Sequence, residues 1–80
     1  MTKATVRVEL KDGVLDPQGV TIKNALKDMG YTEVGSVRSG KVFNLELDID
    51  DKDVAKVKLE EMCSKLLANP VIEQYFIEVD

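Results

Sequence analysis

Strict alternation of apolar and polar side chains constrains the fold of this chain more than any other feature of its sequence. From Phe43 to Ile49 every odd-numbered residue is apolar, and every even-numbered residue between them is polar. The same period of two recurs in residues 4–10 and, less cleanly, in residues 72–79. A period of two is typical of a β-strand with one buried face. The chain is therefore expected to build an antiparallel sheet.

Two segments between these strands repeat their apolar residues at helical spacing. The first helix is predicted to start at Asp16-Pro17, because aspartate caps free N–H groups and proline loses no hydrogen bond in the first turn. It is expected to end at Gly30, and the second helix at Asn69-Pro70. The apolar residues of the first helix are Ile22, Ala25, Leu26 and Met29. Those of the second are Ala55, Leu59, Met62, Cys63 and Leu66.

A further strand is predicted over residues 34–38, joined to residues 41–49 by a tight turn in which Gly40 takes a positive φ. The element order is then β-α-β-β-α-β. This order indicates the α+β class and a ferredoxin-like split sandwich, with a four-stranded antiparallel sheet in the order 4-1-3-2 and two helices on one face. No linker or repeat divides the 80 residues, so residues 1–80 are expected to form a single domain.

Composition excludes several classes of function. Histidine is absent, which excludes a histidine-based catalytic triad and any histidine-containing metal site. A single cysteine excludes an intrachain disulfide. The formal net charge of −4, without a basic run, argues against nucleic acid or an anionic membrane as the main partner. No signal peptide or long apolar run is evident, so a cytoplasmic protein is expected.

The remaining candidates for chemistry favour structural explanations. Cys63 lies among the apolar residues of the second helix, so a small buried side chain is favoured over a reactive thiol. The aspartates of residues 48–53 lack the glycine and the closing glutamate of a calcium loop, and they suit the start of a helix. No pair of carboxylates occupies opposed environments, as acid–base catalysis requires. We therefore expect no catalytic residues and no enzyme activity in this chain alone.

Two surfaces remain as candidates for binding. Ile72 and Phe76 have the opposite parity to Tyr75 and Ile77, so the last strand carries apolar residues on both faces. Apolar side chains on the helix-free face of a two-layer fold favour self-association over scattered exposure. The predicted turn at residues 38–41 presents two cations, and this pattern suits a solvated turn as well as contact with a partner's carboxylate or phosphate.

Three stretches carry a resemblance to a known family: residues 13–19 (GVLDPQG), 37–41 (VRSGK) and 65–73 (KLLANPVIE). At this spacing the chain resembles, over its whole length, the small PurS subunit of bacterial and archaeal phosphoribosylformylglycinamidine (FGAM) synthase. The resemblance implies a ferredoxin-like subunit with no active site of its own. It also implies dimers or larger homo-oligomers, and assembly with a large ATP-dependent synthetase subunit and a glutaminase subunit.

The complex implied by this resemblance converts formylglycinamide ribonucleotide, glutamine and ATP to formylglycinamidine ribonucleotide, ADP, phosphate and glutamate. This is the fourth step of de novo purine biosynthesis, and the small subunit would bridge the other two and aid ammonia transfer. ATP and Mg would bind to the synthetase subunit, and this chain would hold no cofactor. The alternative is a dimeric regulatory domain that senses a small molecule. The residues expected to contact partners are Asp16, Pro17, Gln18, Gly19, Arg38, Gly40, Lys41, Asn69, Pro70, Ile72 and Phe76.

Overall fold

The computed structural model describes residues 1–80 and shows a small α+β fold with an antiparallel sheet and two α-helices. A short π-helix, η1, directly follows the second α-helix. In chain order the elements are β1 (Thr2–Leu10), α1 (Pro17–Asp28), β2 (Gly40–Leu47), α2 (Lys52–Met62), η1 (Cys63–Leu67) and β3 (Glu73–Val79).

The sheet has three strands in the order β2-β1-β3, and both pairs are antiparallel. In the register, Val6 of β1 lies opposite Phe43 of β2 and Ile77 of β3. The three strands with the clearest alternation were therefore predicted correctly, and so was their relative order. The alternating apolar residues of the three strands, among them Val6, Phe43 and Ile77, share the face that α2 covers.

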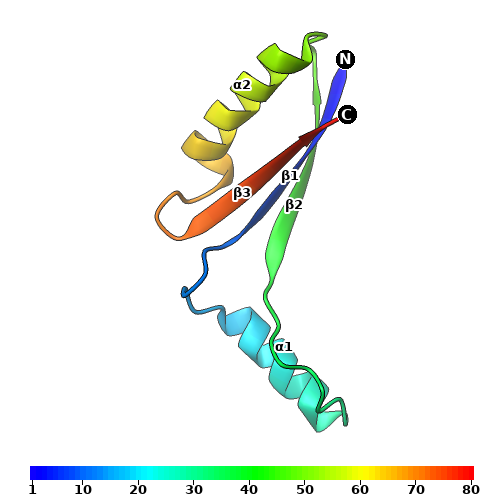
Figure 1. Ribbon diagram of the computed structural model, residues 1–80, viewed down its shortest axis with the longest axis vertical. Coiled ribbons are helices and arrows are strands. Elements are labelled where there is room, and N and C mark those ends of the chain that lie inside the picture. Colours follow the sequence, from blue (N-terminus) through cyan, green and yellow to red (C-terminus); the bar gives the residue numbers. More distant parts are fainter.

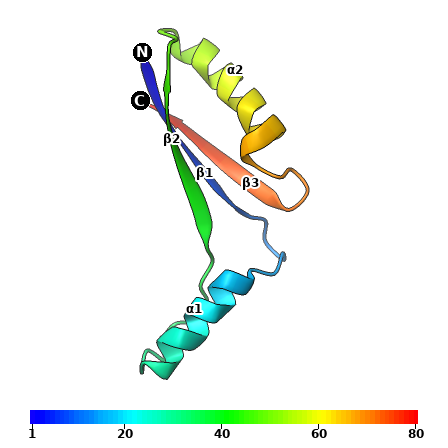
Figure 2. The ribbon, with the colours of Figure 1, turned by 180° about the vertical axis from the view of Figure 1, so that it is seen from behind.

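The predicted fourth strand over residues 34–38 is wrong, so the four-stranded order 4-1-3-2 does not occur in this protomer. These residues join no strand and run back beside α1 toward the sheet (Figures 1 and 2). The tight turn is also absent, because Gly40 does not adopt a positive φ. Gly40 instead begins β2, where a Cβ atom would lie 2.8 Å from the carbonyl oxygen of Val8. Close approach of two strands, rather than a turn, explains this glycine.

The expectation that both helices cover one face of the sheet is also wrong. The ends of α1 are as predicted: the Asp16 side chain caps its start, and Gly30 follows its last turn with a φ of 100°. However, α1 extends beyond the end of the sheet (Figures 1 and 2), and Gly19 is its only buried residue. Ile22 is 39% exposed and Met29 is 69% exposed. The apolar residues of α1 therefore find little cover in this protomer.

The core lies between α2 and the sheet. Its buried apolar residues are Ala4, Val6, Val8, Leu47, Ala55, Leu59, Cys63 and Ala68. Cys63 is completely buried, which confirms its prediction as a core residue, and burial raises the pKa of its thiol. Leu66 was predicted to face the core but is 84% exposed, because the wider turn of η1 changes the helical spacing after Met62. Asn69 stops the helix without a left-handed φ; its side-chain oxygen accepts a hydrogen bond from the N–H of Val71.

The dimensions of the protomer are those of an open structure. Its radius of gyration is 16.1 Å, whereas a compact chain of this length has about 12 Å. Its accessible surface is 5826 Å², whereas size scaling gives about 4,800 Å². Eight buried apolar residues form the core, yet 13 large apolar residues are exposed. The protomer alone therefore leaves much of its apolar surface in water.

Candidate functional site

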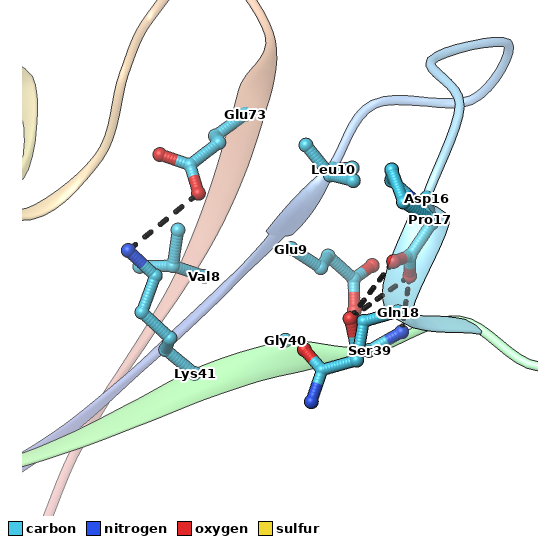
Figure 3. A pocket seen from close by; sticks show the side chains of 10 residues that line it. All are labelled: Val8, Glu9, Leu10, Asp16, Pro17, Gln18, Ser39, Gly40, Lys41 and Glu73. Carbon is cyan, nitrogen blue, oxygen red and sulfur yellow. Dashed lines mark hydrogen bonds and ion pairs between the residues drawn. The ribbon is translucent and has the colours of Figure 1, made fainter. Parts of the chain in front are cut away.

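The three stretches that carry the family resemblance meet at one end of the sheet. They surround a groove of about 390 Å³ that lies between the start of α1 and the adjacent ends of β1, β2 and β3 (Figure 3). Asp16, Pro17 and Gln18 contribute to its lining from the first stretch, Gly40 and Lys41 from the second. Glu73 completes it from the third stretch. Five of the eleven residues predicted to contact partners therefore line this groove. Two more, Gly19 and Arg38, are adjacent in sequence to residues that line it.

Asp16 is the most connected of these residues and is 4% exposed. One carboxylate oxygen accepts a hydrogen bond from the N–H of Gly19 at 3.0 Å, which caps α1. The other accepts from the N–H of Ser39 at 2.5 Å, and the Ser39 hydroxyl donates to the carboxylate at 3.0 Å (Figure 3). The hydrogen bonds from the N–H groups of Ser39 and Gly19 lower the pKa of Asp16, because they stabilise its ionised form.

Arg38 forms its hydrogen bonds within the chain. Its two terminal nitrogens donate to the carbonyl oxygens of Val14 at 2.8 Å and Lys11 at 3.2 Å. The guanidinium group therefore holds the loop between β1 and α1 against the segment that returns to β2. Its side chain remains exposed, so contact with a partner stays a prediction.

The third stretch joins the same region through Lys11 and Glu73. The ammonium group of Lys11 donates to the carbonyl oxygen of Pro70 at 2.8 Å. Glu73 accepts from the N–H of Asn69 at 2.7 Å and lies 3.8 Å from the ammonium nitrogen of Lys41, which faces it across the groove (Figure 3). The structure thus brings Asn69 and Pro70 close to the residues of the first two stretches.

The charges around the groove decide which ligands it suits. Its lining holds three carboxylates, those of Glu9, Asp16 and Glu73, against the single ammonium group of Lys41. An excess of carboxylates opposes the binding of a phosphate or carboxylate ligand. No group of three or more acidic or cysteine side chains has an arrangement that could hold a metal ion. None of the helices has the length and apolar character that a membrane-spanning helix requires.

Phe76 lies on a different surface, the face of the sheet opposite α2. It is 45% exposed, and the guanidinium carbon of Arg7 lies 4.7 Å from the centre of its ring. Together with Val42 these residues line a shallow hollow. Ile72, directly before β3, is also exposed. The predicted apolar contact surface on the helix-free face is therefore accessible in this protomer.

Sequence reasoning missed a second apolar surface, beside η1. Leu45, Met62, Leu66 and Leu67 line an apolar groove of about 440 Å³ between β2 and the end of α2. The sequence carries no clear signal for this surface, because adjacent leucines at positions 66 and 67 also fit one wide apolar face of a regular helix. Sequence reasoning also missed Ser39, the partner of Asp16, because a serine beside a glycine is common in a simple turn.

Comparison with known proteins identifies the family. The family model of PurS, described as phosphoribosylformylglycinamidine (FGAM) synthase, matches residues 3–80. The chain belongs to the PurS family. It is 50% identical to the Bacillus subtilis PurS subunit over 80 residues, covering all of this chain and 94% of that protein. It is 45% identical to the Methanocaldococcus jannaschii PurS subunit over 80 residues, covering all of this chain and 96% of that protein.

Solved PurS structures share the open shape of the protomer. The Bacillus subtilis PurS structure matches with a TM-score of 0.90 over all of this chain and 99% of that chain. A chain in the PurLQS structure from Thermotoga maritima, 32% identical, matches with a TM-score of 0.89 over 99% of this chain and 96% of that chain. The resemblance found in the sequence is confirmed. The chain is a PurS subunit of FGAM synthase, a multi-subunit glutamine-dependent ligase of purine biosynthesis.

Proposed function

We propose that this chain is a non-catalytic assembly subunit that bridges the glutaminase and synthetase subunits of cytoplasmic FGAM synthase and aids ammonia transfer between them. ATP and Mg would bind to the synthetase subunit. The observation that carries the proposal is the exposed apolar surface of α1, which no other element of the protomer covers. Free ammonia becomes protonated or escapes in water, so its transfer needs a closed and partly dry interface, which an assembly subunit can complete.

The proposal includes self-association through α1. The apolar residues Val20, Ile22 and Met29 of α1 are exposed, and the apolar groove beside η1 lies on the sheet face that α1 would cover in a ferredoxin-like sandwich. In its own chain α1 points away from this groove (Figures 1 and 2). A second copy of the chain can supply the missing helix, and exchange between identical copies is a low-cost route to a dimer. Each sheet would then carry two helices on one face.

The surface area supports this exchange. The protomer exposes about 1,000 Å² more than size scaling gives for a compact chain of its mass. A stable protein interface buries about 800 Å² on each partner. The excess is therefore large enough to supply the area that one partner usually contributes. The hollow around Phe76 offers a second contact surface on the opposite face, for a larger homo-oligomer or for the other subunits.

Reconstitution with the two larger subunits tests the bridging function. Glutamine-dependent FGAM synthesis is expected to require this chain. Synthesis with added ammonium salt in place of glutamine is expected to depend on it much less, because ammonia then need not pass between subunits. The proposal fails if glutamine-dependent synthesis and the mass of the complex are both unchanged when the chain is left out.

A further inference from the structure

The connections of α1 raise a physical question about how this helix keeps its direction. Six residues, 11–16, lead into α1, and eleven residues, 29–39, lead back to β2. We define the arm as residues 17–39, which comprise α1 and its returning segment. Six extended residues can span about 20 Å, so the connections alone would let the arm fold back onto its own sheet. Residual freedom of this kind would compete with exchange between copies.

The hydrogen bonds of Asp16 and Arg38 remove that freedom. One oxygen of the Asp16 carboxylate holds the first turn of α1 through the N–H of Gly19. The other oxygen holds the N–H of Ser39, the last residue before β2. Arg38 joins the incoming loop to the returning segment through the carbonyl oxygens of Val14 and Lys11. Both connections are therefore fixed together at the point where the arm leaves the sheet.

Gly19 adds a steric constraint at the same point. A Cβ atom at this position would lie well inside contact distance of the carbonyl oxygen of Val37, and it would also meet a carboxylate oxygen of Asp16 at 3.0 Å. Absence of a side chain at Gly19 lets the returning segment lie directly against the first turn of α1. Lys11 extends this unit to the residue directly before β3, since its backbone N–H donates to the carbonyl oxygen of Ile72 at 2.8 Å.

We propose that the Asp16–Ser39 contact is a positioning element that fixes the direction of the arm, so that α1 is presented to a second copy instead of folding back on its own sheet. Asp16 and Ser39 act here through geometry and need no ligand. The consequence for assembly rests on the exchange of α1 proposed above. The direction of the arm is a property of the single protomer and can be measured separately.

Asp16→Asn separates the cap of α1 from this positioning role. Asparagine is itself a good helix cap, so its carbonyl oxygen can still accept from the N–H of Gly19. Its NH₂ group would face the N–H of Ser39, and two donors cannot form a hydrogen bond. The helical content of α1 should therefore persist while the hydrogen bond from the backbone N–H of Ser39 is lost. Asp12→Asn, in the same loop and exposed, is the matched control for the change in charge.

The test measures the distance between spin labels at Lys27→Cys in α1 and Lys56→Cys in α2 by pulsed electron resonance. Cys63 is buried and remains in place. Dilution of labelled chain into a large excess of unlabelled chain leaves only distances within one chain. We expect one narrow distance distribution for the otherwise unchanged chain and for Asp12→Asn. For Asp16→Asn we expect a distribution at least twice as wide or displaced to shorter distances, with unchanged circular dichroism.

An equally narrow distribution at the same distance in folded Asp16→Asn would overturn the proposal. If Asp16→Asn does not fold, Ser39→Ala replaces it; this variant removes only the hydroxyl donor and must still widen the distribution. An unchanged distribution in Ser39→Ala would then overturn the proposal. A monomeric chain that nevertheless gives a narrow distribution, widened by Asp16→Asn, would refute the exchange of α1 but support the positioning role.

Discussion

Replacement of Ile22 by aspartate tests whether a second copy covers α1. Ile22 is 39% exposed in the protomer, and complete burial of an isoleucine side chain stabilises by about 1.5–3 kcal/mol. Covering the exposed part is therefore worth about 0.6–1.2 kcal/mol per copy. A two-fold dimer contains the site twice, which gives about 1–2 kcal/mol. Burial of an unpaired polar group adds about 1–3 kcal/mol per copy.

Together these contributions are at least about 3 kcal/mol, so Ile22→Asp should weaken self-association by at least ~100-fold. Sedimentation equilibrium over a range of concentrations measures the dissociation constant. Asn24→Asp is the matched control, because it places the same charge on the opposite side of the same helix. The reasoning is refuted if Ile22→Asp dissociates no more readily than Asn24→Asp while both retain their helical content.

Four further predictions address other parts of the structure. Phe76→Asp should weaken self-association or binding of the larger subunits by at least ~10-fold in sedimentation, since a charge enters an apolar contact surface. Unchanged masses of both the homo-oligomer and the complex with the larger subunits would contradict this prediction. Lys41→Ala should lower the affinity of the complex in a titration of the larger subunits, and an intact affinity would remove this residue from the interface. Gly19→Ala should lower the free energy of unfolding by about 1–3 kcal/mol in urea, because the returning segment must move away from α1; no loss would argue against close packing there. Because the pKa of Asp16 is lowered in the folded chain, the ionised Asp16 carboxylate stabilises the fold fully above about pH 4, and this stabilisation is lost as the pH falls below that value. Unfolding curves should therefore show a smaller loss of stability on acidification for Asp16→Asn than for the unchanged chain.

Elements defined by local chemistry could be predicted from the sequence. The alternation around Phe43 gave a correct strand, and the cap at Asp16 and the stop at Gly30 gave the correct ends of α1. Each of these features depends on residues within a few positions of one another, so the local sequence pattern determines the local structure directly. Burial of Cys63 followed in the same way from its helical neighbours.

The direction of α1 could not be predicted, because its apolar residues form the same pattern whether they pack on their own sheet or on another copy. Residues 34–38 alternate only weakly and include Gly35, and their actual course depends on the distant contact between Asp16 and Ser39. The exposure of Leu66 depends on one π-helical turn, which the spacing of the apolar residues does not reveal. The candidate residues at positions 16–19 and 38–41 were placed together by the fold, whereas their expected contacts with partners remain predictions.

The mass of the isolated chain in solution tests most directly whether the protomer is incomplete. Sedimentation equilibrium should give twice the mass of one chain, or a higher multiple, at micromolar concentration, and the chain should lose stability as dilution separates the copies. A folded species with the mass of one chain, stable on dilution and with an intact α1, would contradict the account.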